Sequence, residues 1–164
     1  MTGVQTCALP ISAVLVGCGG ASAEVDGSAG GVEFGKTNQV YFGGPFIIIS
    51  MLELDCEDVD YVRRNYEIGL APTDSDTQLI QFSFDEDTIS EGDFPVDIDA
   101  AVSSSVVKIS GGAFTETVAS GGLLTVDSFE DEDHVDGTFD GITFEDGTVS
   151  GEFSAVWCRN LKAK

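Results

Sequence analysis

The chain has 164 residues, of which 42% are hydrophobic and 11 are Phe. This composition is enough for one folded domain with a buried core, and it excludes a disordered chain. The formal net charge is −22, from 29 Asp and Glu against 7 Lys and Arg. A surface of this charge repels the phosphates of nucleic acids and of anionic lipids, so we expect neither as an electrostatic partner.

Residues 1–12 have the sequence MTGVQTCALPIS. They resemble the in-frame translation of a common sequencing adapter, and the resemblance extends from Thr2 to Ile11. It implies that residues 1–12 are a non-native segment, so we leave Cys7 out of the reasoning about the fold.

The next stretch is apolar and ends in a small residue and a cysteine, Leu15-Val16-Gly17-Cys18. It resembles the lipobox of bacterial lipoprotein signal peptides. The resemblance implies that residues 13–18 are the remnant of a signal peptide and that Cys18 carries a lipid anchor. Because Gly19 stands where an aspartate often retains such proteins in the inner membrane, it also favours the outer membrane of the cell envelope. The alternative is that residues 15–18 form an ordinary buried strand.

Residues 19–31 consist mainly of Gly, Ala and Ser and contain no aromatic side chain. Small residues of this kind bury little apolar surface and behave as flexible coil. We therefore expect a glycine-rich tether over residues 19–31, followed by a single β domain over residues 32–161.

From residue 32 onward, alternation of apolar and polar residues and frequent Gly or Asp-Gly turns predict short strands. The pattern indicates an all-β, antiparallel β-sandwich or flattened barrel. One short helix is expected near residues 57–66, where acidic residues come first and two arginines come late. The predicted strands are 32–34, 39–42, 46–54, 77–84, 94–98, 101–109, 114–118, 123–129, 135–139, 142–144 and 149–157.

The sequence VDGTF at residues 135–139 recurs as VSGEF at residues 149–153. In the second copy the apolar residues fall on one face of the strand and Ser150, Glu152 and Ser154 on the other, which predicts burial on one side only. The glycine inside each copy predicts close packing beneath an aromatic ring. These copies, ending in Cys158, and an early Leu54-Asp55-Cys56 resemble a group of all-β bacterial lipoproteins without an established activity.

Two cysteines remain once Cys7 and Cys18 are set aside. Cys56 and Cys158 are the number that one disulfide requires, and an exported protein meets an oxidising compartment where the bond persists. Zinc binding is the competing use, but neither cysteine has a nearby histidine in the sequence, and no C-x-x-C motif points to redox activity.

Acidic clusters occupy the predicted loops at residues 74–76, 85–87, 97–99 and 130–133. Carboxylates are the ligands that calcium prefers, and extracellular calcium sites are often weak. None of the clusters matches an EF-hand loop, and turn formation is the simpler interpretation. If one cluster binds calcium, we expect the ligands to be Asp131, Asp133 and Asp136. The one histidine, His134, lies among these acids and is interpreted as a solvated turn residue.

These observations favour a non-enzymatic, lipid-anchored domain of the cell envelope that has a structural role or binds a protein or glycan partner. No cofactor is expected, apart from the calcium just described. Two alternatives remain open. One is a calcium-dependent adhesion or binding module, and the other is a hydrolase that uses a pair of carboxylates, although no nucleophile elbow or phosphate-binding loop occurs.

Overall fold

The computed structural model describes residues 20–59, 76–86, 88–159 and 161. The fold is all-β, as the sequence predicts, and the strands of the described residues form one twelve-stranded sheet. The strands are β1 (Ser22–Ala29), β2 (Val32–Glu33), β3 (Lys36–Thr37), β4 (Gln39–Gly43), β5 (Phe46–Ser50), β6 (Thr77–Phe84), β7 (Gly92–Pro95), β8 (Val102–Ser110), β9 (Ala113–Val118), β10 (Gly121–Glu130), β11 (His134–Phe144) and β12 (Gly147–Trp157).

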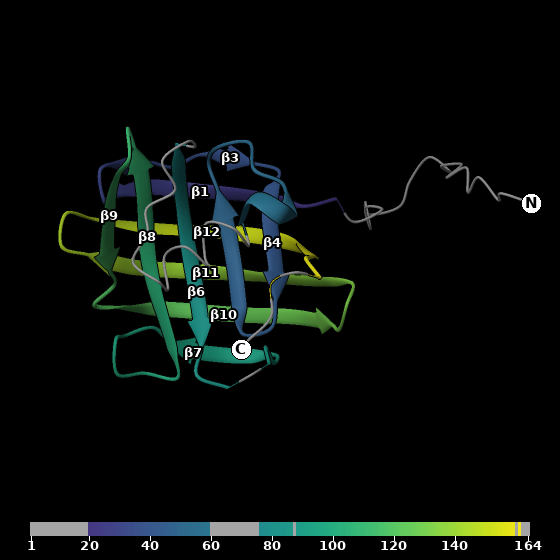
Figure 1. The fold of residues 1–164 in the computed structure, drawn as a ribbon. Helices are drawn as coiled ribbons and strands as arrows, with labels where there is room; N and C mark the ends of the chain where they lie inside the picture. The colour runs from purple at the N-terminus through teal and green to yellow at the C-terminus, as the bar shows by residue number, and fades with distance from the viewer. Residues whose placement is uncertain (1–19, 60–75, 87, 160, 162–164) are drawn as a thin grey trace, which may run out of the picture.

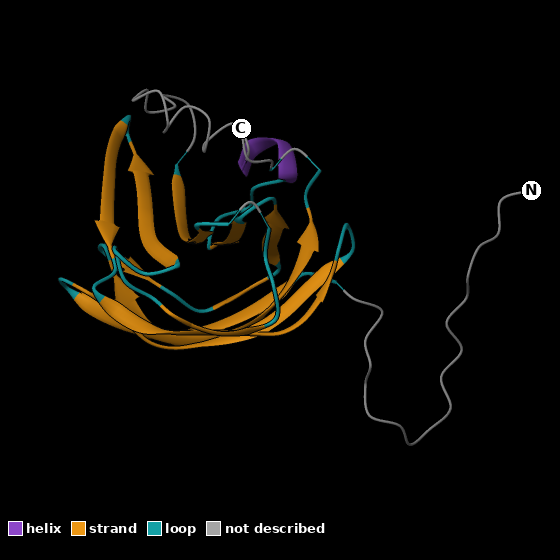
Figure 2. Cartoon of the chain, turned by 90° about the horizontal axis from the view of Figure 1, so that it is seen from below, coloured by secondary structure: helices purple, strands orange, loops and turns teal. Residues whose placement is uncertain are grey.

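The sheet is strongly curled into two layers whose strands cross (Figure 1). One layer holds β7, β10, β11, β12 and β1, and the other holds β4, β5, β6, β8 and β9. The layers are continuous because the end of β12 pairs in parallel with β4, Val156 with Tyr41 and Trp157 with Phe42. The other pairs between named strands in the described part of the chain are antiparallel. The molecule is therefore a half-barrel with a mixed sheet (Figure 2).

The main core lies between the two layers. Inward-facing residues alternate with outward-facing ones along each strand, as the period of two in the sequence requires. The rings of Phe82 on β6 and Phe139 on β11 lie 5.4 Å apart between their centroids and join the two layers. Burial of such rings is a main source of stability in a fold of this size.

A second apolar cluster lies on the other face of β5, β6 and β8. It contains Ile48, Leu79, Val107 and Ile109 from the strands and Leu54, Val59, Cys158 and Leu161 from the segments that cover them. The apolar run in β5 is thereby explained, because Ile47 and Ile49 face the main core while Ile48 faces this second cluster. A strand that is buried on both faces has no polar side to alternate with.

The prediction of a flexible tether over residues 19–31 is wrong for most of that stretch. Residues 22–29 form β1, which pairs with β12 from Ser22 opposite Ser154 to Ser28 opposite Thr148. The small side chains of this segment suggest that it has no place in a core, yet Ala23, Val25 and Ala29 are buried. Main-chain hydrogen bonds to a long neighbouring strand stabilise a segment whose own side chains bury little area.

Among the described residues one helix is present. It begins at Cys56, one residue before the expected start, and is described as far as Val59; the rest of the expected range lies outside the described residues. Asp55 caps it, because its Oδ1 accepts hydrogen bonds from the backbone N–H groups of Glu57 and Asp58 at 2.8 and 2.9 Å. The N–H of Asp55 donates in return to Oδ2 of Asp58 at 3.3 Å. This reciprocal pair is a variant of the capping box.

Most strand boundaries agree with the prediction to within two residues, and three predicted strands or pairs of strands differ by more. Strand β5 ends at Ser50 and not at residue 54, and β7 covers residues 92–95 and not 94–98. The two strands predicted at 135–139 and 142–144 are one continuous strand, β11, whose register shifts between Phe139 and Ile142. Gly141, with φ of 60°, lies in this irregularity, so the glycine that reads as a turn is a bulge within the strand.

Candidate functional site

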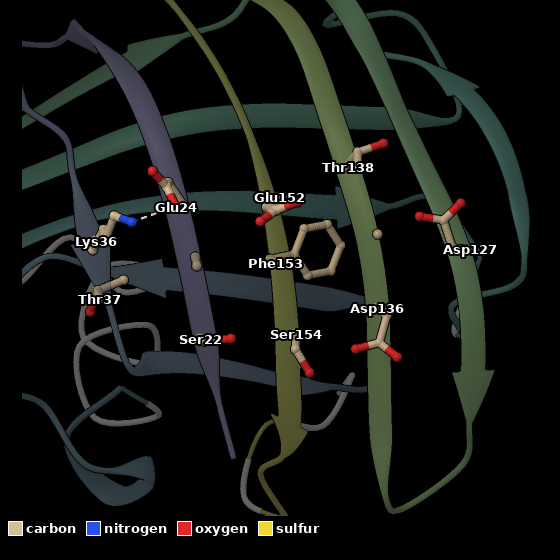
Figure 3. A pocket seen from close by; sticks show the side chains of 12 residues that line it. Ser22, Glu24, Lys36, Thr37, Asp127, Asp136, Thr138, Glu152, Phe153 and Ser154 are labelled. Atoms are coloured by element: carbon tan, nitrogen blue, oxygen red, sulfur yellow. Dashed lines mark ion pairs between the residues drawn. The ribbon is translucent and has the colours of Figure 1, made fainter. Parts of the chain in front are cut away.

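An open groove of about 450 Å³ lies on the outer face of the layer formed by β10, β11, β12 and β1 (Figure 3). Most of its lining side chains point away from the core and carry oxygen atoms. The lining residues are Ser22, Ala23, Glu24, Lys36, Thr37, Asp127, Asp136, Gly137, Thr138, Glu152, Phe153 and Ser154.

Strand alternation places these polar groups on one surface. Glu24 on β1, Glu152 on β12 and Thr138 on β11 are successive partners in the sheet register and are all exposed. Their neighbours in sequence, such as Val25 and Phe153, turn into the core. The groove is therefore the solvent face of the same strands whose other face builds the core.

Two glutamates stand directly opposite each other here, Glu24 on β1 and Glu152 on β12. Like charges at this position destabilise a sheet. Lys36 on β3 offsets part of the repulsion, because its Nζ lies 2.7 Å from Oε2 of Glu24. The hydrogen bond and charge of Glu24, with the charge of Glu152, raise the pKa of Lys36 above its ordinary value.

Asp127 enters the groove through a β-bulge. In the register of β10 against β11, Val126 pairs with Gly137 and Ser128 pairs with Asp136, so Asp127 is the extra residue. Bulges of this kind redirect a side chain relative to the regular pleat. Beside it, the hydroxyl of Ser128 donates a hydrogen bond of 2.9 Å to Oδ2 of Asp136, which orients that carboxylate.

The groove is rich in carboxylate and hydroxyl groups. Glu24, Asp127, Asp136 and Glu152 supply carboxylates from four strands, and the ammonium group of Lys36 is already paired. Hydroxyl groups of Ser22, Thr37, Thr138 and Ser154 lie among them. Such a surface accepts hydrogen bonds and attracts positively charged groups, and it repels anions.

No family model, curated protein or solved structure matches this chain. The groove and the cluster at the β10–β11 turn are therefore described from the positions and chemistry of their own residues.

A second polar cluster lies at the turn between β10 and β11. Glu130, Asp133 and His134 place one possible ligand atom each within 4.8 Å of one another. Glu130 and His134 are register partners at the end of the hairpin. The ring of His134 lies between two carboxylates, with Nδ1 3.3 Å from Asp133 and Nε2 3.6 Å from Asp136. The hydrogen bond with Asp133 is the main cause that raises the pKa of His134.

The residues predicted as calcium ligands are not grouped as expected. Asp133 joins Glu130 and His134, whereas Asp136 lines the groove next to Ser128 and Asp131 lies in the turn. Glu130 was not among the predicted ligands. It lies beside His134 because the two residues are paired across the β10–β11 hairpin, which the spacing of residues in the sequence does not show. Calcium binding itself stays a prediction.

Two of the other acidic clusters have described residues with a clear structural role. Asp76 accepts a hydrogen bond from the N–H of Gly111 at 3.3 Å, and Asp97 accepts one from the N–H of Ile98 at 2.6 Å. These contacts hold turns, in agreement with the simpler interpretation of those loops. Asp74 and Asp87 lie outside the described residues.

The predicted pairing of Cys56 and Cys158 is confirmed. A disulfide joins them, with a Cα–Cα distance of 5.6 Å and a sequence separation of 102. The N–H of Cys158 donates to the carbonyl of Phe42 at 2.7 Å, so the bond ties the start of the helix to the region where β12 meets β4. Cys18, the predicted site of lipid attachment, lies outside the described residues. Within the described part of the chain, no helix is long and apolar enough to cross a membrane.

Proposed function

We propose that this protein is an exported, lipid-anchored binding domain of the bacterial cell envelope, without catalytic activity, and that the outer groove is its recognition surface. The observation that carries the binding role is the groove itself, in which carboxylates from four strands surround a cavity of about 450 Å³. A volume of this size lies in the range of ligand sites, and the oxygen-rich lining suits a partner with positively charged groups.

The disulfide supports the location. Disulfides persist in oxidising compartments such as the periplasm and the cell surface and are rare in the cytosol. The bond between Cys56 and Cys158 therefore agrees with export through the signal peptide that residues 13–18 resemble. In this proposal Cys18 carries the lipid, and the domain is sorted to the outer membrane.

The charge of the groove favours a class of partner. Glu24, Asp127, Asp136 and Glu152 leave the surface negative around Lys36. We infer that the groove binds a protein segment or glycan that presents positively charged amino or guanidinium groups. Charge complementarity of this kind speeds encounter and selects partners, and its strength falls as salt is added.

Lipid attachment is tested first. The segment 1–12 is replaced by a working signal-peptide start, and the intact mass and membrane fractionation are compared with those of Cys18→Ala. We expect an increase of acyl size that depends on Cys18. An unmodified, soluble product from the parent chain would refute the anchor.

Binding is tested separately. Calorimetric titration with a lysine-rich peptide is compared between the parent chain, Asp127→Asn with Glu152→Gln, and a control with the same charge change at exposed positions, Asp99→Asn with Glu86→Gln. We expect a higher dissociation constant for the groove variant than for the parent chain, and little change for the control. Equal losses in both variants would show that net charge, and not the groove, attracts the peptide.

The hairpin cluster favours one alternative, a calcium-dependent binding module. Glu130 and Asp133 offer carboxylates within 4.8 Å of each other and of His134. A ligand that binds only the folded state raises its stability. The alternative therefore predicts a higher melting midpoint in calcium than in chelator, and a loss of this difference in Asp133→Asn. An unchanged midpoint in the parent chain would exclude it.

A further inference from the structure

The first strand begins very close to the proposed lipid. Ser22, the first residue of β1, follows Cys18 by four positions. Four extended residues span at most about 14 Å, whatever their conformation. The domain therefore has far less reach than the tether expected from the sequence would allow.

The start of β1 is firmly held. Ser22 pairs with Ser154 on β12, and Ala23 pairs with Phe153 on one side and Thr37 on the other. Ala23 and Val25 are buried, and Ala21 already packs against the core. Releasing β1 to lengthen the tether would break this pairing and expose core residues, so the short reach is a property of the folded domain.

The short distance between Cys18 and Ser22 keeps one end of the molecule close to the proposed lipid. We call it the anchor end and define it by Ser22, the turn Glu130–His134 and Trp157. Ser22 belongs to this end because it pairs with Ser154 on β12. The turn and Trp157 meet because His134 pairs with Val156 and the N–H of Trp157 donates to the carbonyl of Asp133 at 3.1 Å. Figure 1 shows β1 beginning at the same end at which β10 and β12 finish.

We propose that the anchor end rests against the surface of the bilayer and that the groove opens beside the lipid headgroups. This inference depends on the proposed lipid at Cys18. Ser22 and Ser154 line the groove and belong to this end, so a partner reaches the groove at the membrane surface. A bilayer of zwitterionic lipids suits this end of the protein. The outermost groups of such lipids are cationic, and the turn presents the carboxylates of Glu130 and Asp133 to them. Attraction between such charges and the headgroups acts over about one Debye length, roughly 8 Å at physiological salt.

Trp157 makes the proposal measurable, because the chain has 1 Trp and it lies at the anchor end. The full chain with Cys7→Ser is coupled at Cys18 to a maleimide phospholipid and reconstituted in phosphatidylcholine vesicles that contain a dansyl-labelled headgroup. Cys56 and Cys158 do not react because they are bonded to each other. Energy transfer from Trp157 to dansyl reports the distance between the anchor end and the bilayer.

The matched control carries twenty Gly and Ser residues inserted between Gly20 and Ala21, which adds a root-mean-square reach on the order of 25 Å. We expect strong transfer in the parent chain and a loss of about half or more in the insertion variant, because the longer coil lets the domain move away. Equal transfer in the two chains, or weak transfer in the parent, would overturn the inference.

The chemical coupling separates the two proposals. Strong transfer in coupled protein, together with an unmodified Cys18 in cells, would remove the biological anchor and leave the geometry intact. A lipidated Cys18 in cells with weak transfer in coupled protein would keep the anchor and overturn the placement of the domain at the surface.

Discussion

The ring of Phe153 on β12 packs against the backbone of Gly137 on β11, its direct partner in the register. The same arrangement is repeated in reverse two positions away, where the ring of Phe139 packs against Gly151. The two copies of the internal repeat thus pair with each other, and each supplies the glycine that the other's ring requires. This confirms the prediction that both glycines lie beneath aromatic rings, and it couples the floor of the groove to the core.

We expect Gly137→Ala to destabilise the fold by about 1–3 kcal/mol, because overpacking displaces core side chains and backbone. A Cβ at this position would clash with the backbone carbonyl oxygen of Thr125 and would lie 2.8 Å from Cζ of Phe153. Urea unfolding measures the free-energy difference. Gly121→Ala in β10 is the matched control, since a Cβ there meets nothing within 4 Å. Equal stability of Gly137→Ala and the parent would contradict the packing argument.

Removing the disulfide should lower the stability strongly. The bond closes a loop with a sequence separation of 102 residues, for which the chain-entropy model gives about 4–5 kcal/mol. We expect Cys56→Ser with Cys158→Ser to show a much lower melting midpoint than the Cys7→Ser parent, which keeps the bond. Reducing agent should lower the midpoint of the parent and leave that of the double variant unchanged. A parent that is insensitive to reductant would show that the bond contributes little.

Neutralising Glu152 should stabilise the sheet slightly. Glu152 faces Glu24 across β1 and β12, and removal of one charge from a like-charged cross-strand pair is worth roughly 0.2–1 kcal/mol. We expect the gain of Glu152→Gln in urea unfolding to shrink as salt rises, because screening weakens the same repulsion in the parent. Asp99→Asn, at an exposed turn, controls for the change in net charge. A gain equal to that of Asp99→Asn would argue against the specific pair.

Tyr41 links the stability of the fold to alkaline pH. Its hydroxyl donates to the carbonyl of Leu54 at 2.8 Å, and it lies 2.9 Å from Oε1 of Gln39. Burial, followed by the charges of Asp55 and Asp58, raises the pKa of Tyr41 above its ordinary value of 10.0. The folded state therefore holds this proton more tightly than the unfolded state, so the contribution is complete below pH 10 and is lost as pH rises through the folded pKa.

Tyr41→Phe tests this. Near neutral pH we expect a loss of about 1 kcal/mol, the usual net value of a hydrogen bond. Above pH 10 the difference from the parent should narrow, because ionisation destabilises the parent and not the variant. Urea unfolding across this range gives both values. If the difference in unfolding free energy between Tyr41→Phe and the parent stayed constant across this pH range, the pKa of Tyr41 would not differ between the folded and unfolded states.

Local pattern was sufficient for the parts of this fold in which side chains alternate clearly. The strand at residues 149–157 was predicted with its inward and outward faces, because a period of two is built into the geometry of a strand. The pairing of Cys56 with Cys158 followed from counting the cysteines. The start of the helix was predicted within one residue, since its acidic first turn caps the backbone locally.

Tertiary structure decided the features in which distant segments meet. Residues 22–29 have too little apolar area to signal a strand, and they form one because β12 offers a complete set of main-chain partners. The groove is likewise non-local, since its carboxylates come from β1, β10, β11 and β12, and Asp127 enters it only through a bulge against β11. The sequence by itself determined which residues face the core only in the strands with clear alternation, and it did not do so for Ala23, Val25 and Ala29 in β1. The pairing of strands, with its register and bulges, determined which of the outward-facing residues form a site.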